Sequence, residues 1–214
     1  MALAATIPDS TPLIEEHVDT GLREFLAEYR PSYVPGGPVD ELEDRYTIHT
    51  SKRIASLSHN FADAYEVTDK NAAGRALYAM VCTPELPYRM QAITDAQHFN
   101  HSHLQVPVSF GTVRLSSLGA SRFVLIFEKP TGSLLSEMIG NQTRMHETKV
   151  ISTLLEPACN ALIALRDRKI HHGNIRPENF FLGSTAVLGE CYSAACGTLN
   201  HFLYQPLERM MCDP

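Results

Sequence analysis

The spacing of apolar side chains in this chain changes once, near Gly132. Before that point, from Tyr46 to about Leu125, short runs rich in β-branched and aromatic residues alternate with turn-like stretches, a pattern typical of antiparallel strands. After it, apolar residues recur at i, i+3 and i+4, which is the spacing of amphipathic helices. The sequence therefore predicts an α+β chain, with a meander of about five strands followed by a mainly helical half.

Each half can be divided into elements by its pattern. The predicted strands are YTIHTSKRI, DAYEV, RALYAMVC, SFGTVRL and RFVLIF, and the predicted helices are PYRMQAITDAQHF, SLLSEMI and ETKVISTLLEPACNALIALRDRKI. Pro157 lies inside the long helix and should kink or split it near Glu156, because proline lacks the N–H group that a helix needs. The segment FEKPTG reads as a hinge, and two lobes joined by a hinge predict a ligand cleft between them.

The first 45 residues have a different character from the rest. One short amphipathic helix, DTGLREFLAEY, precedes a stretch in which Pro and Gly prevent regular structure. Its apolar stripe of Leu22, Phe25 and Leu26 is expected to pack onto the rest of the chain or, as the less favoured alternative, onto a partner, because a lone short helix is marginal in water. The chain ends at ERMMCDP without a polar tail, a stretch that is expected to continue into more structure. The predicted divisions are an extension at 1–45, a β-rich lobe at 46–129 and a mainly helical lobe at 130–214.

Composition narrows the partners and the compartment. The formal net charge of −6 comes from intermixed acids and bases, so neither nucleic acid nor an anionic membrane is an expected partner. No window approaches the roughly 20 apolar residues of a membrane span. The five cysteines follow no metal-binding spacing and suit free thiols in a reducing compartment. The sequence therefore predicts a cytoplasmic protein.

The segment IHHGNIRPENFFLG, which follows the long predicted helix, resembles the catalytic loop of the eukaryotic-like protein kinases. The resemblance implies a bilobal protein kinase-like fold, with a five-stranded antiparallel N-lobe that contains one helix and a partial, mainly helical C-lobe. It places His172 at the His position of the kinase pattern, Gly173 at the Arg, Asn174 at the Asp, Arg176 at the Lys and Asn179 at the metal-binding Asn.

Two further segments of the second half resemble kinase motifs. VLGECY is similar to the strand that enters the DFG motif, which puts Glu190 in the place of the metal-binding Asp, Cys191 in that of Phe and Tyr192 in that of Gly. YQPLER is similar to the end of an activation segment, with Pro206 and Glu208 matching the Pro and Glu of its APE motif.

The first half departs from the kinase pattern. Its third strand resembles the kinase strand that carries the phosphate-binding Lys, but Val81 stands in that place. Residues 57–65, LSHNFADAY, take the place of the Gly-rich loop without a glycine, so the backbone cannot approach phosphates closely, and Asp63 would repel them. The following helix has no Glu to pair with a lysine.

These departures predict a pseudokinase rather than an enzyme. Phosphoryl transfer depends on a lysine, on metal ligands and on a carboxylate that orients the substrate hydroxyl. Val81, Asn174 and Glu190 are degenerate at those three positions, and an amide cannot take a proton at neutral pH as a carboxylate can. No catalytic residue and no cofactor are therefore predicted.

Asn179 and Glu190 are the weak candidates for ATP or Mg²⁺ ligands, because their oxygens are of the kind that Mg²⁺ accepts. The favoured interpretation gives Asn179 a bracing role in the loop and makes Glu190 a solvated acid. One alternative is a weak or unconventional phosphotransferase that uses Glu190, Asn179 and a lysine such as Lys52. Another is a purely structural module of a larger chain.

A protein is the expected partner of such a domain. The segment from Cys191 to Tyr204 corresponds to a mobile kinase loop and combines small residues with the aromatics Tyr192, Phe202 and Tyr204. Aromatic side chains on a loop can anchor an interface. These three residues are the candidate partner contacts, although packing of Phe202 and Tyr204 on the helical lobe would explain them equally well.

The remaining candidates favour structural roles. His98, His101 and His103 in HFNHSH lack a metal-protease spacing or an acid at a helical offset, so a surface loop is favoured over a metal site. Cys191 and Cys196 have no cationic neighbour in the sequence that would lower their pKa and are expected to be inert thiols.

Overall fold

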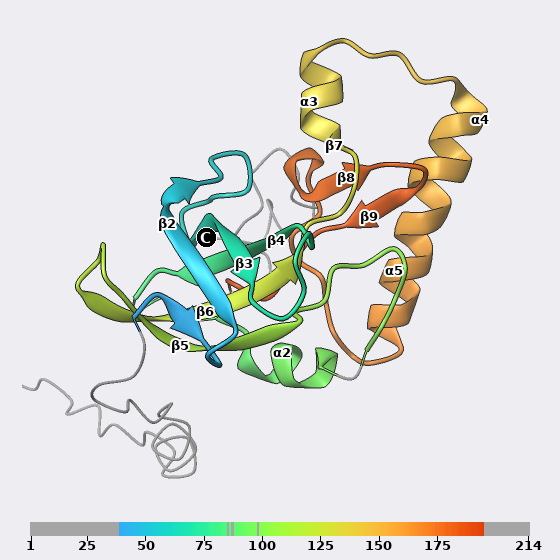
Figure 1. The fold of residues 1–214 in the computed structure, drawn as a ribbon. Coiled ribbons are helices and arrows are strands. Elements are labelled where there is room, and N and C mark those ends of the chain that lie inside the picture. The colour runs from blue at the N-terminus through green and yellow to red at the C-terminus, as the bar shows by residue number, and fades with distance from the viewer. Residues whose placement is uncertain (1–38, 85, 87, 98, 195–214) are drawn as a thin grey trace, which may run out of the picture. The chain divides into compact units, whose positions relative to one another are not determined.

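The computed structural model describes residues 39–84, 86, 88–97 and 99–194. The predicted helix at 19–29 lies outside these residues. The described part contains a six-stranded sheet and a three-stranded sheet (Figure 1). The strands of the large sheet are β1 (Glu41–Leu42), β2 (Tyr46–Arg53), β3 (Ala62–Asp69), β4 (Leu77–Cys82), β5 (Ser109–Leu115) and β6 (Ala120–Glu128).

The large sheet is antiparallel throughout, in the order β1-β2-β3-β4-β6-β5. It has one strand more than the five predicted. The additional strand, β1, lies inside the stretch that was assigned to the N-terminal extension, so the sheet begins before residue 46. Two residues are too short for an alternating pattern, and the sequence offers no signal for such a strand.

The central strand β4 is buried at every position because both faces of the sheet are covered. Tyr78, Met80 and Cys82 belong to the cluster on the inner face, which also contains residues of the helical half. Ala79 and Val81 belong to a second cluster, the outer cluster, which contains only residues of the strands. Successive strand side chains point to opposite faces, so the strand feeds two separate cores.

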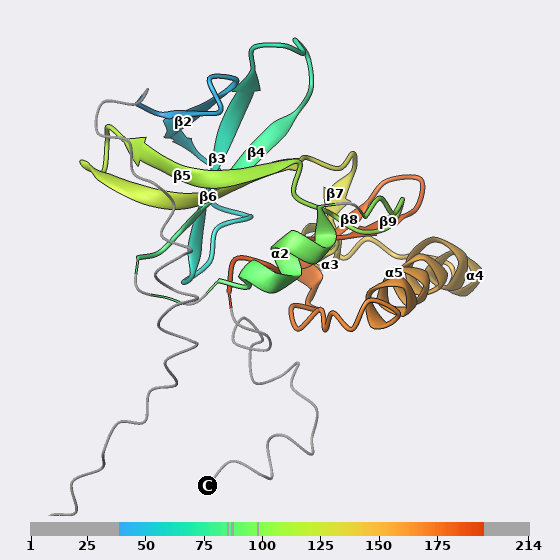
Figure 2. The ribbon, with the colours of Figure 1, turned by 90° about the horizontal axis from the view of Figure 1, so that it is seen from below.

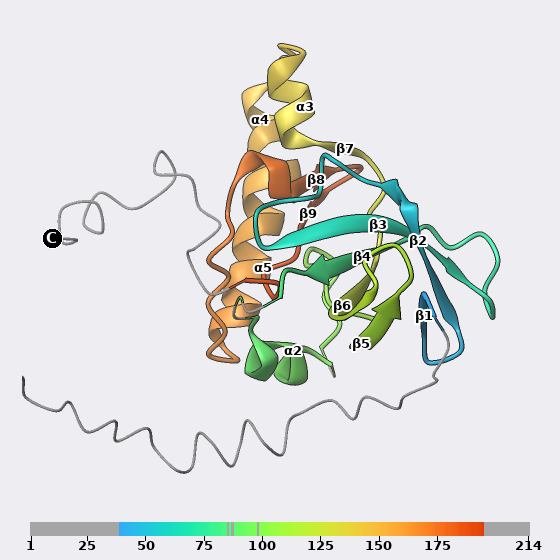
Figure 3. The ribbon, with the colours of Figure 1, turned by 90° about the vertical axis from the view of Figure 1, so that its left-hand side faces the viewer.

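The helix α2 (Met90–Ala96) lies beneath the large sheet (Figure 2). Its Ala92, Ile93 and Ala96 are buried in the inner cluster. The small sheet is formed by β7 (Ser133–Leu134), β8 (Phe180–Leu182) and β9 (Ala186–Leu188), in that order. Strand β9 lies against the long helix of the second half (Figure 3), where Leu188 shares the inner cluster with residues of that helix.

The second half begins with α3 (Leu135–Gly140) and continues with one helical run over Glu147–Arg166. This run consists of α4 (Glu147–Val150), a π-helical stretch (Ile151–Leu155) and α5 (Glu156–Arg166). Pro157 was expected to kink or split the helix near Glu156. Instead the run continues through Pro157, and the backbone widens into the π form directly before Glu156. A proline removes one helical hydrogen bond, which this wider turn accommodates.

Among the described residues, the run Glu147–Arg166 is the one helix whose length and apolar composition would suit a membrane span. Core helices of soluble domains pass the same test, and Pro157, Ala161 and Leu165 are buried, the last two in the inner cluster. On the exposed side of the helix, Ile151, Leu155 and Ile163 are 44%, 50% and 46% exposed and alternate with the exposed polar residues Ser152, Glu156 and Asn160.

Candidate functional site

The loop that resembles the kinase catalytic loop joins α5 to β8, and His172 is its buried anchor. His172 Nε2 lies 3.0 Å from the carbonyl oxygen of Gly189, and its Nδ1 accepts a hydrogen bond from the backbone N–H of Asn174 at 3.2 Å. Burial lowers the pKa of His172 to about 4, and the contact with Gly189 offsets this only in part. The side chain is therefore a neutral imidazole with its proton on Nε2.

Gly173, between these two residues, has a φ of 66°. This left-handed conformation favours glycine because a Cβ atom would be strained there. The backbone conformation of the loop therefore explains a glycine at this position, where the kinase pattern has Arg.

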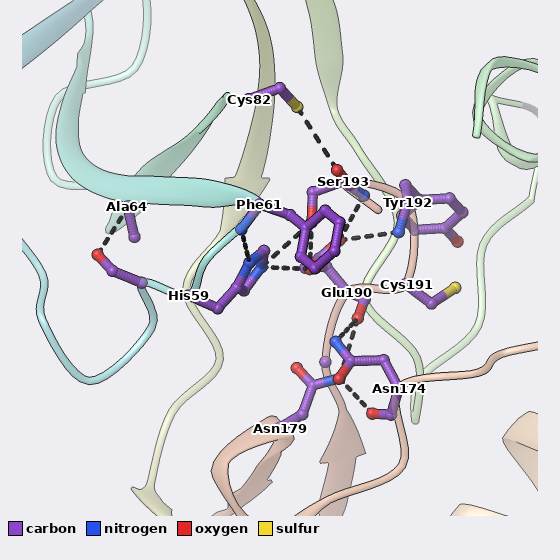
Figure 4. Close-up of polar contacts among 12 residues, drawn as sticks. His59, Phe61, Ala64, Cys82, Asn174, Asn179, Glu190, Cys191, Tyr192 and Ser193 are labelled. Carbon is purple, nitrogen blue, oxygen red and sulfur yellow. Dashed lines mark hydrogen bonds and ion pairs between the residues drawn. The ribbon is translucent and has the colours of Figure 1, made fainter. Parts of the chain in front are cut away.

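Two amide side chains connect this loop to the segment after β9 (Figure 4). Asn174 donates from Nδ2 to the carbonyl oxygen of Glu190 at 3.0 Å. Asn179 donates from Nδ2 to the same oxygen and to the carbonyl of Asn174, both at 2.9 Å. Asn179 ends the 3₁₀ turn Pro177–Asn179, which places it directly before β8. These contacts give Asn179 a bracing role.

Gly189 makes room for this bracing. A Cβ atom at that position would lie 2.0 Å from Asn179 Oδ1, far closer than any tolerable contact. The close approach of the backbone to the amide is therefore possible only with glycine.

The carboxylate of Glu190 is buried, with 3% of the residue exposed, and the expectation of a solvated acid is wrong. Oε2 accepts from the backbone N–H groups of Tyr192 at 2.8 Å and Ser193 at 3.0 Å. Oε1 accepts from Ser193 Oγ at 2.8 Å and lies 3.3 Å from His59 Nε2. Burial alone would raise the pKa of Glu190, but the hydrogen bonds from His59 and Ser193 lower it to about 2.

His59 reaches this cluster from the loop between β2 and β3, the loop that takes the place of the kinase Gly-rich loop (Figure 4). Its Nδ1 accepts a hydrogen bond from the backbone N–H of Phe61 at 3.2 Å, which places the proton on Nε2. Nε2 faces both Glu190 and Ser193 Oγ, the latter at 3.2 Å. The contact between His59 and Glu190 is thus a charge-assisted hydrogen bond, donated by Nε2 to the carboxylate.

A serine, a histidine and a glutamate in contact invite comparison with a hydrolase triad, but the connectivity is different. In a triad the acid and the serine bind opposite nitrogens of the ring. Here both Glu190 and Ser193 face Nε2 of His59, and Ser193 Oγ is placed to donate to the carboxylate. Ser193 is also buried, with 1% exposed. The three residues hold two segments together and do not form a nucleophile.

Val81, which the resemblance places at the kinase Lys position, points away from the inner face of β4. Val81 faces the outer cluster with Val124 and Ile126, whereas Cys82 faces the inner side. The Cys82 thiol lies 4.0 Å from the carbonyl oxygen of Ser193, and burial raises its pKa. Cys82 therefore brings a neutral thiol to the inner face beside Ser193.

Lys52, the lysine suggested for an unconventional phosphotransferase, is engaged on the surface of the sheet and not with Glu190. Lys52 Nζ pairs with Glu66 Oε2 at 3.1 Å, and both side chains are more than half exposed. Arg53, beside it, pairs with Asp63 at 2.6 Å.

Arg89, which the sequence reasoning missed, connects the loops to α2. Its guanidinium donates to the carbonyl oxygens of His172 at 3.2 Å and Cys191 at 2.9 Å, and its backbone N–H donates to Tyr192 at 2.9 Å. Arg89 directly precedes the first residue of α2. A basic residue before a helix carries no signal of such a contact, because both acceptors are backbone groups far away in the sequence.

Tyr192, a candidate partner contact, does not lie on the surface. Its side chain is fully buried, stacks on Phe127 with ring centroids 6.2 Å apart, and its hydroxyl lies 3.4 Å from the carbonyl oxygen of Gln105. Cys191 beside it is buried too. Phe202, Tyr204 and Cys196 lie outside the described residues.

The two described histidines of the histidine-rich loop contact each other and strand β9. His101 and His103 are half-buried, with ring centroids 5.7 Å apart, and His103 Nδ1 lies 3.3 Å from the carbonyl oxygen of Ala186. His98 lies outside the described residues. No group of three His, Cys, Asp or Glu side chains suited to a metal ion is found within the part of the chain that the structure describes.

An open cavity of about 590 Å³ lies beside the predicted hinge, and its lining does not include His59, Glu190 or Ser193. Phe99, Gln105, Glu128 and Lys129 are among its lining residues. Gln105 is held in its wall, because its Nε2 donates to the carbonyl oxygen of Glu128 at 2.9 Å and its Oε1 accepts from Tyr78 at 2.7 Å.

Comparison with known proteins gives the fold. The sequence matches no family model and no curated protein. The structure is similar to that of Rad53 residues 1–466 in complex with AMP-PNP, with a TM-score of 0.59 and 13% sequence identity. The match covers 72% of this chain and 40% of that chain. A likeness at this identity shows the fold alone, and the chain has a protein kinase-like fold.

Proposed function

We propose that this domain is a pseudokinase, which does not transfer phosphate and acts by binding a protein partner. The observation that carries the proposal is the state of Glu190. By resemblance it holds the metal-binding position, yet its carboxylate is already engaged by His59, the Ser193 hydroxyl and the backbone N–H groups of Tyr192 and Ser193. A magnesium ion would have to replace buried, charge-assisted hydrogen bonds.

The other degenerate positions support the same conclusion. Asn174 has an amide in place of a base, and its Nδ2 is engaged by a carbonyl. Cys82 brings no positive charge to the inner face of β4. Catalysis of phosphoryl transfer consists almost entirely of positioning and charge stabilisation. In the described structure, strand β4 carries no lysine, and the Glu190 carboxylate is already engaged by protein groups.

Nucleotide binding is the direct test, since the structurally similar Rad53 chain holds AMP-PNP. Thermal shift should be measured with AMP-PNP, alone and with Mg²⁺ or Mn²⁺. A ligand at 100 times its dissociation constant adds about 2.7 kcal/mol of stability, so specific binding is readily visible. We expect no shift and no ATP-dependent labelling of a generic substrate. Labelling that Asn179→Ala abolishes would overturn the proposal.

The apolar face of the long helix supports the second half of the proposal. Ile151, Leu155 and Ile163 are exposed there. Exposed apolar patches are typical of protein contacts, and we infer that these three side chains contribute to one. If the domain binds a partner through this face, Leu155→Lys should reduce recovery of that partner in affinity capture. Ile139→Lys is the matched control, because Ile139 is 58% exposed on α3. Equal recovery with both variants would exclude this face.

A further inference from the structure

The contact between His59 and Glu190 joins segments that are 131 residues apart in the sequence. Both side chains are nearly inaccessible, with 6% and 4% of their side-chain surface exposed. A hydrogen bond to a charged group in such surroundings is worth about twice a neutral one, and it is little screened by solvent.

On one side, His59 is part of the loop itself. Its backbone pairs with Ala62 at the start of β3, at 2.9 and 3.2 Å, and its ring accepts from Phe61. The neighbouring Ser58 Oγ accepts from the backbone N–H of Ala64 at 3.0 Å. A displacement of the His59 ring therefore disturbs the whole turn that leads into β3.

On the other side, Glu190 organises the chain that follows β9. Its carboxylate fixes the backbone N–H groups of Tyr192 and Ser193, and its carbonyl oxygen receives the amides of Asn174 and Asn179. A change at the carboxylate therefore reaches the segment 190–194 directly.

We propose that His59, Glu190 and Ser193 form a latch that couples the loop between β2 and β3 to the segment 190–194, so that the two open and close together. A ligand that approaches the Glu190 carboxylate must displace His59 first. The latch is independent of the proposed protein binding, because it concerns the mobility of two described segments of the chain.

Hydrogen exchange measured by mass spectrometry on the full chain tests the latch. The variant His59→Ala removes one donor to Glu190 and should raise exchange at least tenfold in two peptides, one covering residues 54–64 and one covering 190–194. Ser193→Ala approaches from the other side and should raise exchange in the 54–64 peptide, although the substitution lies outside it. His59→Gln retains a donor and should restore part of the protection.

His49→Ala is the matched control. His49 lies on β2, and its Nε2 contacts Thr68 Oγ1 at 2.7 Å on the exposed side of the sheet. It should leave both peptides unchanged. The latch is refuted if His59→Ala raises exchange in the loop while residues 190–194 stay protected. It is refuted equally if exchange rises by the same factor across β4 and β6, since that result describes loss of global stability.

Discussion

Asn174 directs its Nδ2 toward the carbonyl oxygen of Glu190, 3.0 Å away, and its Oδ1 is buried without a hydrogen-bond partner among the described residues. The resemblance to kinases makes Asn174→Asp look like a repair of the catalytic loop. The geometry predicts damage instead, because a carboxylate oxygen would then face a carbonyl oxygen in a buried site.

Asn174→Asp should therefore lower the free energy of unfolding by about 2–3 kcal/mol, the cost of losing a buried hydrogen bond and leaving a charge unpaired. It should not create phosphotransfer activity, since catalytic groups act as a unit. Urea unfolding at pH 7 measures the first effect, and Asn141→Asp at the exposed end of α3 is the control. A variant as stable as the wild type would contradict the assigned amide orientation.

Stability should depend on the protonation of His172. The folded-state pKa of about 4 lies below the ordinary 6.5, so the unfolded chain binds this proton more readily. The stabilising contribution is complete above pH 6.5 and is lost as the pH falls toward 4. The folded and unfolded pKa values of His172 differ by about 2.5. Because one pKa unit corresponds to about 1.36 kcal/mol, the pH-dependent contribution to stability is about 3 kcal/mol. Unfolding free energies from pH 7 to pH 4 should show this loss, and His172→Gln should flatten the profile over that window. A wild-type profile that is flat there would show that the ring can accept a proton in place.

Gly189→Ala should be strongly destabilising, because the new Cβ would collide with Asn179 Oδ1 and separate the amide from the Glu190 carbonyl. A loss of about 2–4 kcal/mol is expected, measured by thermal or urea unfolding. Gly140→Ala serves as the control: a Cβ there meets nothing within 4 Å, and that variant should be neutral or slightly more stable. Equal stability of the two variants would refute the close approach at Gly189.

Arg89→Ala should loosen the attachment of α2 to the two loops. It removes hydrogen bonds to the carbonyl oxygens of His172 and Cys191, and we expect a loss of about 2–3 kcal/mol. It should also raise the pKa of His172, because the positive charge of Arg89 lowers it. Titration of His172 by NMR checks this second effect. Arg166→Ala, in an exposed pair with Asp167, should change neither quantity.

The regular elements could be predicted from the sequence because their periodicity is local. The strand SFGTVRL begins and ends as expected at Ser109 and Leu115, and the long helical pattern begins at Glu147 as expected. The outward orientation of Val81 could not be predicted, for a physical reason. A strand buried on both faces loses the polar and apolar alternation that would show which side chain faces inward.

The site was harder to predict because long-range contacts define it. Nothing near Glu190 in the sequence reveals His59, and Tyr192 reads as a loop aromatic until Phe127 is placed beside it. Asn174 and Asn179 were found because a family pattern preserves their spacing within one loop. Both amides donate to the carbonyl oxygen of Glu190. Every residue has such a backbone oxygen, so the residue type gives no indication of this contact.

The π-helical stretch before Pro157 sets the angular relation between the two ends of the long helix. One additional residue in a helical turn rotates everything beyond it by about 100° about the axis. The side chains of α4 are therefore rotated about the helix axis relative to where a continuous α-helix through α5 would place them. Deleting a single residue such as Ser152 would restore the regular α-helical spacing. Glu147 and Lys149 would then turn to a new side of the domain, while Ala161 and Leu165 stay in the core.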